Sequence, residues 1–459
     1  MSLIWRSALA RRLGGLILGA ALALSGPAVA QQAELTPENM KKAAFVLLQR
    51  GQPERALALA DAVLLQFPED ATALILKSKA ERDLGRYGPA QASAKLAWAK
   101  AQDPRDQYGA ALAAAQSLSS GGQKFRAQFW LRRAMQVAPN ERARRVAEKD
   151  FAYVRTRSRL ALKFDLSIDP SSNVNNGSSS DVVWFLGLPF VLSGDARALS
   201  GVTSSVGVAG RYRLSETETA KTDLRFTLAH SMVTLSGSAK AQAPAARGAD
   251  YAFSAIEVGL DRYLRLSQRD EVHLGLAVGR NWFGGDPMSS YLRGGAEYRR
   301  DLTKTIRGTA AISHERQFRE DAAIRSAEVT RLSFGLDSVL GNRDRLRMEV
   351  RATDTASQSS DIDHRSWGIS LDWTRAKPVL GGRVTLGLMA EGRDYDRSRY
   401  STDGRHDLTI GADLSVAFEE ADYMGFIPVL SLKSRQTTSN VSLFDSQSTG
   451  LGLSIQSKF

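Results

Sequence analysis

Residues 447–459 read QSTGLGLSIQSKF, and apolar and polar side chains alternate along this stretch. On an extended strand, one face carries Leu451, Leu453, Ile455 and Phe459. The other face carries Gly450, Gly452, Ser454, Gln456 and Lys458. This pattern is typical of a transmembrane β-barrel, whose outside meets lipid and whose inside meets water. We therefore expect a closing barrel strand here, with Phe459 as the aromatic signal for barrel assembly.

The same alternation runs through most of the chain from Ser158 onward, in segments divided by Gly, Asp, Ser and Asn. Between residues 407 and 419, for example, every even position from Leu408 to Phe418 is apolar. Tilted strands of this length cross a bilayer, and closure of the sheet leaves no unpaired edge. An even strand number returns both ends of the barrel to the same side. The pattern predicts about fourteen antiparallel strands, at 158–168, 202–214, 219–233, 250–266, 270–282, 289–302, 304–318, 324–340, 345–353, 363–376, 383–396, 407–419, 424–436 and 447–459.

The apolar run 182–192 would add a further strand, but it contains Pro189, which cannot donate to a central ladder. We expect this run to form a plug or an inward segment instead of wall. Short connections such as 340–344 should lie at the periplasmic end, and long ones such as 235–248 outside. Interfacial aromatic girdles are expected from Trp184, Trp282, Trp367, Trp373, Tyr298, Tyr395 and Tyr423.

The first thirty residues have the layout of a signal peptide. A positively charged start precedes the apolar stretch Leu13–Leu24, and Ala28 and Ala30 supply the small residues of a cleavage site. Beyond residue 30, no stretch offers the roughly 18 consecutive apolar residues of a transmembrane helix. The sequence contains no cysteine, so we expect no lipid anchor on this chain, no disulfides and no thiolate metal site.

The formal charge of +12 could indicate nucleic acid binding. In an exported barrel, however, Lys and Arg more often line the lumen or contact anionic lipid headgroups, so we expect outer-membrane lipids as partners and no nucleic acid. Inward charges should pair across neighbouring strands. His314 and Glu315 are consecutive on an expected strand and point to opposite faces. Without a phosphate-binding loop or a His-Glu-x-x-His motif, we expect neither an enzyme nor a cofactor or metal.

Residues 35–155 are rich in Ala, Leu, Arg and Gln and have helical spacing. Three segments repeat the order Gly, Ala, small residue, Pro, with glycines 34 and 37 residues apart. The repeats are Gly51, Ala56, Val63 and Pro68; Gly85, Ala90, Ala97 and Pro104; and Gly122, Ala127, Ala134 and Pro139. This order resembles the tetratricopeptide repeat (TPR), in which Gly ends the first helix and Pro closes the second. About three repeats suffice to bury a continuous core.

The sequence therefore predicts an α plus transmembrane β chain with three parts. These are a signal peptide at 1–30, a periplasmic TPR-like helical domain at 31–155 and a transmembrane β-barrel at 156–459. The helical domain is expected to hold an extended segment of a client or partner protein, with a plain spacer at the barrel mouth as the alternative.

The barrel opens with DPSSNVNNG at 169–177, directly after its first expected strand. Pro170, Asn173 and Asn175 form a Pro-x-x-Asn-x-Asn pattern there. This stretch is either a plain Asx-type turn or a plug or gate, and we expect the second role.

The last expected hairpin carries TSNVSLF at 438–444, including Ser439 and Asn440. Mid-barrel motifs are YRRDL at 298–302 and HER at 314–316. In this order along one barrel, the motifs resemble the surface lipoprotein assembly modulator (Slam) family, whose barrel opens with Pro-x-x-Asn-x-Asn and closes with a Ser-Asn hairpin.

The Slam resemblance implies a translocator that delivers surface lipoproteins, or a soluble secreted client, from the periplasm to the cell surface. The helical domain would engage the client or a periplasmic chaperone, the barrel would be the conduit, and the barrel-assembly machinery would be a further partner. Two alternatives stay open: an exopolysaccharide-export barrel with a TPR scaffold, and a general porin.

Overall fold

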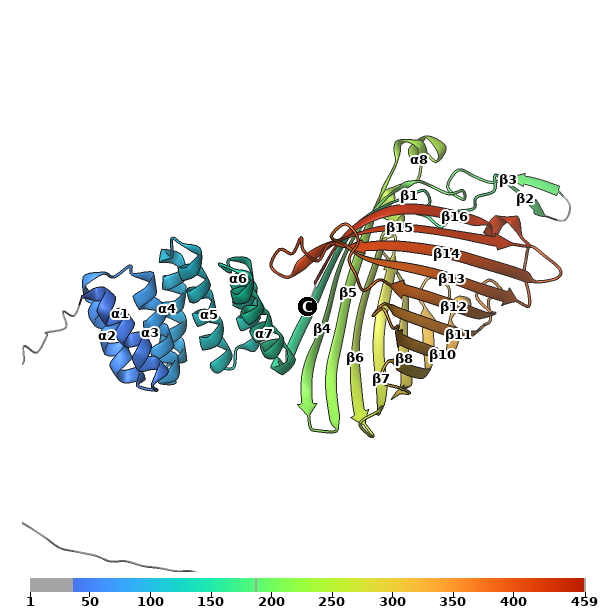
Figure 1. Cartoon of the computed structure of the whole chain (residues 1–459). Coiled ribbons are helices and arrows are strands. Elements are labelled where there is room, and N and C mark those ends of the chain that lie inside the picture. Colours follow the sequence, from blue (N-terminus) through green and yellow to red (C-terminus); the bar gives the residue numbers. More distant parts are fainter. Residues whose placement is uncertain (1–35, 186–187, 458–459) are drawn as a thin grey trace, which may run out of the picture.

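The computed structural model describes residues 36–185 and 188–457 and shows a helical stack followed by a closed β-barrel (Figure 1). Within the described residues, no helix is both long enough and apolar enough to cross a membrane. The helices of the stack are α1 (Pro37–Gln49), α2 (Pro53–Gln66), α3 (Ala71–Asp83), α4 (Tyr87–Lys100), α5 (Pro104–Ser120), α6 (Lys124–Gln136) and α7 (Glu141–Arg157).

The repeat glycines allow the tight turns between paired helices. Gly51, Gly85 and Gly122 have φ of +69°, +75° and +79°, in the left-handed region that glycine adopts without strain. The repeat alanines 56, 90 and 127 are fully buried, because only a small side chain lets neighbouring helices approach so closely. These positions confirm the TPR-like arrangement.

One repeat proline differs from the expectation. Pro68 follows the end of α2, as expected, whereas Pro104 occupies the first turn of α5 instead of closing α4. A proline fits the first turn of a helix, where its missing N–H would have no partner within the helix. Asp103 caps the same helix by accepting from the N–H groups of Arg105 and Asp106.

Fourteen antiparallel strands close the barrel, in agreement with the predicted number. Each strand pairs with its neighbour in sequence, and β1 pairs with both β4 and β16. The wall consists of β1 (Leu160–Ser171), β4 (Gly201–Glu216), β5 (Ala220–Leu235), β6 (Phe253–Arg265), β7 (Asp270–Phe283), β8 (Asp286–Asp301), β9 (Ile306–Arg319), β10 (Ala327–Val339), β11 (Arg345–Ser357), β12 (His364–Thr374), β13 (Arg383–Tyr395), β14 (Arg405–Ala417), β15 (Phe426–Ser439) and β16 (Ser446–Ser457).

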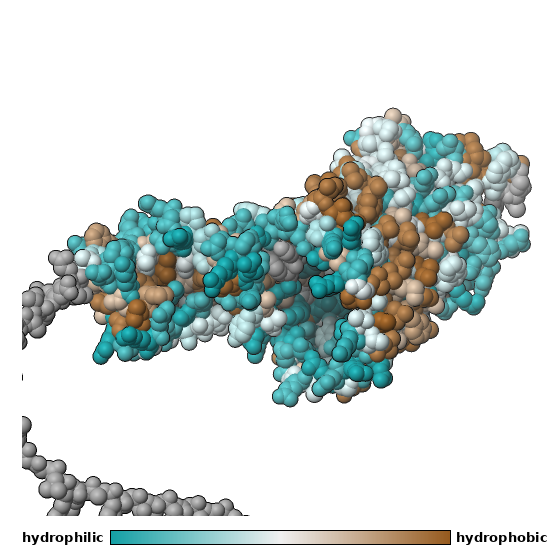
Figure 2. Space-filling model, in the orientation of Figure 1, coloured by the Kyte–Doolittle hydropathy of each residue, from teal (hydrophilic) through white to brown (hydrophobic). Residues whose placement is uncertain are grey.

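The predicted alternation of faces holds in the wall. On β11, Met348 and Val350 are exposed on the outside, whereas Glu349 and Arg351 line an internal pocket. Figure 2 shows hydrophobic residues spread over the middle of the barrel wall and hydrophilic residues toward its ends. An apolar exterior around a polar interior is the arrangement of a barrel that spans an outer membrane.

We call the end where β1 leaves α7 the near end, and the opposite end the far end. The turn 340–344 lies at the near end and the long connection 236–252 at the far end, as their lengths predicted. One short turn departs from this rule. Gly284 and Gly285 connect β7 to β8 at the far end, with φ of +62° and +92°.

The described residues of the run, 182–185 and 188–192, lie outside the wall, as expected, but do not form a plug. β2 (Val182–Phe185) and β3 (Leu188–Val191) pair as a separate two-stranded sheet that projects from the far end (Figure 1). Trp184 belongs to this hairpin and is 62% exposed, so its placement in an aromatic girdle was wrong. Tyr395 was also misplaced, because it is only 6% exposed and lies against the guanidinium of Arg405.

Candidate functional site

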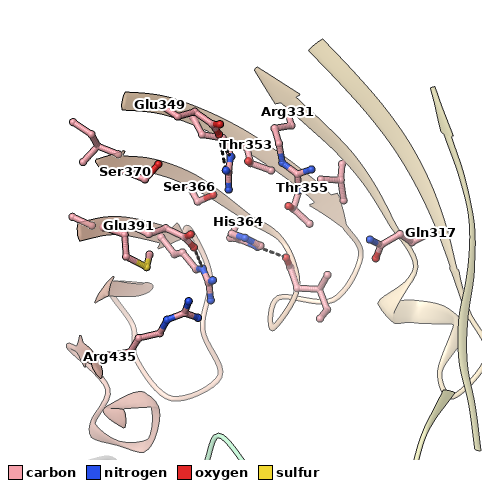
Figure 3. Close-up of a pocket in the computed structure, with 18 residues that line it drawn as sticks. Gln317, Arg331, Glu349, Thr353, Thr355, His364, Ser366, Ser370, Glu391 and Arg435 are labelled. Atoms are coloured by element: carbon pink, nitrogen blue, oxygen red, sulfur yellow. Dashed lines mark hydrogen bonds and ion pairs between the residues drawn. The ribbon is translucent and has the colours of Figure 1, made fainter. Parts of the chain in front are cut away.

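A polar pocket of about 660 Å³ opens inside the barrel between β9 and β15 (Figure 3). Four arginines and two glutamates contribute to its lining: Arg331, Arg351, Arg393, Arg435, Glu349 and Glu391. Two of the arginines bond to the glutamate two residues before them on the same strand. Arg351 donates to Glu349 at 2.6 Å, and Arg393 donates to Glu391 at 2.5 Å.

The adjoining part of the lumen wall, from β5 to β9, has a denser ion-pair network. Arg225 contacts Glu257 and lies 3.0 Å from Asp261, and Arg293 contacts Glu257 and lies 3.2 Å from Glu315. Tyr291 donates its hydroxyl to Glu257 at 2.7 Å. Arg225 with its two partners and Arg293 with Glu315 join neighbouring strands, which confirms the expected cross-strand pairing of inward charges. The contacts of Arg293 and Tyr291 with Glu257 reach from β8 across β7 to β6.

The side chains of Asn173 and Asn175 organise the connection 172–200 at the far end. Asn173 donates to the carbonyl of Gly177 at 2.9 Å and accepts from the N–H of Gly177 at 3.0 Å. Asn175 donates to the carbonyls of Asp195 and Arg197, both at 2.9 Å. Pro170 lies within β1 opposite Val202. The motif therefore fixes a loop, and its gate role stays a prediction.

Ser439 and Asn440 act in the same way on the last hairpin. The Asn440 side chain accepts from the N–H of His406 at 2.8 Å and donates to the carbonyl of Gly404 at 3.2 Å. The Ser439 hydroxyl accepts from the N–H of Val441 at 3.1 Å. The Asn440 bonds join the last hairpin to the start of β14 and the residue before it, whereas the Ser439 bond lies within the hairpin.

The two motifs, far apart in the sequence, meet where β1 and β16 close the barrel. Asn173 donates to the carbonyl of Gln447 at 3.3 Å. Further along the loop, Ser178 donates its hydroxyl to the carbonyl of Ser442 at 3.1 Å, and the N–H of Ser179 donates to the carbonyl of Asp445 at 2.8 Å. We call these contacts the far-end seam.

A joint connects the helical stack to the near end of the barrel. On α6, Arg132 donates to the carbonyl of Met424 at 2.7 Å and to the hydroxyl of Ser457 at 3.2 Å. Its guanidinium also lies over the ring of Phe426, 4.9 Å from the centroid. Burial lowers the pKa of Arg132.

Two further side chains strengthen the joint. Arg144 on α7 lies 3.4 Å from the carboxylate of Asp422, and the side chain of Gln136 accepts from the N–H of Met424 at 3.2 Å. The turn 418–425 between β14 and β15 is therefore bound by both of the last two helices of the stack. No motif in the sequence indicated this joint, because its partners are almost 300 residues apart.

A groove of about 240 Å³ crosses the helical stack. Arg82 on α3, Gln116 on α5, and Asp150 and Tyr153 on α7 contribute to it. Arg82 bonds to Gln116 across the neighbouring helices α3 and α5. No motif in the sequence indicated these residues. Burial raises the pKa of the Asp150 carboxyl.

Some residues that the sequence singled out lie beyond the described part of the chain. The cleavage-site residues Ala28 and Ala30 and the terminal Phe459 lie outside the described residues, so their roles stay predictions. In the described part of the chain, no group of three or more His, Asp or Glu side chains is arranged to hold a metal ion.

Comparison with known proteins shows similarity to solved structures but does not show a protein family for this chain. No protein-family model matches the chain, and no curated protein matches it. The helical part is similar to the Yersinia enterocolitica type III secretion translocator chaperone SycD, with 18% identity over 26% of this chain and 83% of that chain, at a TM-score of 0.23.

The barrel is similar to solved porin structures. An anion-selective porin from Comamonas acidovorans is 10% identical over 65% of this chain and 98% of its own, at a TM-score of 0.37. OccAB3 of Acinetobacter baumannii is 8% identical over 64% of this chain and 99% of its own, at a TM-score of 0.36. Likeness at this level says nothing about what this chain transports.

Proposed function

We propose that this chain is an outer-membrane translocator of the Slam type, which moves a lipoprotein or a secreted soluble client from the periplasm to the cell surface. The near end with its helical stack would face the periplasm, and the far end would face outward. The observation that carries the proposal is the joint, because Arg132 and Arg144 bind the helical stack, which contains the groove, to one mouth of a polar lumen.

The groove suits an extended segment of a client. It combines the ring of Tyr153, which is 57% exposed, with the polar side chains of Gln116 and Asp150. Helical repeat stacks commonly present such surfaces to extended partners. A periplasmic chaperone that delivers the client could use the same surface.

The lumen suits an unfolded chain. Barrels of eight strands are filled by their own side chains, whereas barrels of sixteen to eighteen strands leave an aqueous channel. A barrel of fourteen strands lies between these sizes and would admit an extended segment more readily than a folded domain. Folding of the client outside would then prevent its return, which supplies direction without a nucleotide.

The far-end seam is the proposed gate. The loop organised by Asn173 and Asn175 would cover the exit, and its bonds to the last hairpin would hold it between passages. Phe459 would direct the chain to the barrel-assembly machinery.

The test is deletion of the gene followed by labelling of intact cells with a membrane-impermeant reagent and identification of the labelled proteins. The proposal expects at least one outer-membrane lipoprotein or secreted protein to lose surface exposure while its cellular amount is retained. Expression of the full chain should restore exposure. Unchanged labelling of every such protein would remove the translocator proposal.

A general porin is the second candidate, because inward side chains such as Arg331 and Arg435 are exposed to solvent in the lumen. A porin would conduct steadily and would leave surface labelling of other proteins unchanged on deletion.

A further inference from the structure

Two arginines in the lumen pocket have no counter-charge. Across the described residues, the side chains of Arg331 on β10 and Arg435 on β15 make no hydrogen bond and no ion pair, and both residues are solvent-exposed. Figure 3 shows both side chains among the residues that line the pocket. An arginine is charged at every accessible pH, so both sites are permanently positive.

The acids of this pocket do not neutralise these two cations. Glu349 and Glu391 are bonded to Arg351 and Arg393, respectively. With four arginines against two glutamates, the pocket carries a net positive charge. The adjoining wall from β5 to β9 differs, because Arg225 and Arg293 there are each held between two carboxylates.

Neutral groups that can bind an anion lie around the arginines. Hydroxyl groups on β11 and β12 line the same pocket, at Thr353, Thr355, Ser366 and Ser370. A planar guanidinium binds a carboxylate or a phosphate through two parallel hydrogen bonds, and hydroxyls can complete the set of donors. Low-dielectric walls also focus the field of the unpaired charges into the lumen.

We propose that Arg331 and Arg435 form an anion-binding site in the far half of the lumen, which recognises phosphate or carboxylate groups and makes the open pore select anions. The groups could come from free small anions or from an acidic segment of a polypeptide in the lumen. The site depends only on the described lumen and holds whether or not the chain is a translocator.

The first experiment measures reversal potentials of the full-length protein in planar lipid bilayers under a KCl gradient. The wild type is expected to prefer chloride over potassium. The Arg331→Gln, Arg435→Gln double variant should reduce the ratio of chloride to potassium permeability at least about threefold. The reason is that the two charges it removes face the lumen and have no partner. Glu349→Gln with Glu391→Gln should raise the ratio, since it frees Arg351 and Arg393.

Arg142→Gln with Arg145→Gln is the matched control. It removes the same charge from the exposed surface of α7 and should leave the ratio unchanged. Heat-modifiable migration on gels establishes for each variant that the barrel has closed. A wild-type pore without anion preference, or a double variant no different from the control, would overturn the proposal.

A second experiment identifies the source of the anionic group. Inorganic phosphate and a ten-residue polyglutamate peptide are added in turn, and the concentration that halves the chloride current is measured. A lower blocking concentration for phosphate identifies small anions, and a lower one for the peptide identifies an acidic segment. In either case, the double variant should raise the blocking concentration at least about tenfold relative to the wild type. If phosphate and the peptide blocked the chloride current equally in the wild type and the double variant, or did not block it at all, the proposed site would be contradicted.

Discussion

The guanidinium of Arg132 on α6 donates to the main-chain oxygen of Met424, 2.7 Å away, in the turn that joins β14 to β15. Met424 has a φ of +53°, so the turn presents its carbonyl from an unusual backbone conformation. This bond couples the orientation of the helical stack to the rim of the barrel.

Arg132→Ala should therefore loosen the stack without unfolding the barrel. A hydrogen bond to a charged group contributes about 1.5–3 kcal/mol, and the lost contact with Phe426 adds to this effect. Because the chain has no cysteine, spin labels can be placed at Lys95→Cys on α4 and Lys377→Cys in a near-end turn. The distance distribution should broaden in the variant.

Arg126→Ala is the control for the joint, because Arg126 lies on the same helix and bonds to Gln123. Arg132→Lys should restore part of the narrow distribution. A distribution that is equally narrow in Arg132→Ala and in the wild type would show that the joint does not fix the stack.

Gly177→Ala should disorder the connection 172–200. A Cβ at Gly177 would lie 2.3 Å from the carbonyl oxygen of Arg197, a clash that costs about 1–3 kcal/mol to relieve. Trypsin added to proteoliposomes should cleave after Arg197 several-fold faster than in the wild type. Gly237→Ala in the neighbouring connection is the control, since its Cβ would meet open space. Equal cleavage rates in both variants would contradict the structural role of the loop motif.

Asp150→Asn should stabilise the helical stack at neutral pH. Burial raises the pKa of this carboxyl, so between its ordinary pKa of about 4 and the raised value the folded chain binds a proton that the unfolded chain has released. Stability therefore falls as pH rises through this window, and the full penalty is present above it.

The midpoint of thermal unfolding, followed by helical circular dichroism, should rise by about 1–2 °C in Asp150→Asn at pH 7. At pH 3, where the carboxyl is protonated in both the folded and the unfolded chain, the wild type and the variant should have the same unfolding midpoint. A difference of the same size at both pH values would contradict this explanation.

Deletion of Phe459 should lower the amount of closed barrel in the outer membrane several-fold, if the assembly machinery recognises a terminal aromatic. Heat-modifiable migration of the membrane fraction measures the closed form. Lys458→Ala keeps the aromatic and is the control. Normal amounts of closed barrel after deletion of Phe459 would show that this residue is dispensable.

Local patterns were enough to predict the wall and the repeats. The alternation from Leu408 to Phe418 specifies a strand because one face must meet lipid, and Gly51 and Gly85 specify tight helical turns. The misplaced residues have physical reasons too. Trp184 lies in an apolar run, but Pro189 five residues later cannot donate to the wall, and the two strands of this run pair with each other outside the barrel.

The seam, the joint and the lumen pocket could be predicted less well from the sequence, because their residues meet only in the folded chain. Asn173 and Gln447 are 274 residues apart, and Arg132 and Met424 are 292 residues apart. The unpaired state of Arg331 also depends on its neighbours across the strands, which the order of residues along one strand does not reveal.

The most direct measurement of the central claim is site-specific photo-crosslinking in living cells at two positions of the path, Tyr153 in the groove and Ser366 in the lumen pocket. Phe334, on the lipid-facing side of β10, is the control position. The translocator account predicts that one client polypeptide crosslinks at both Tyr153 and Ser366 and not at Phe334. Crosslinking of a polypeptide at Tyr153 with none at Ser366 would contradict passage through the barrel.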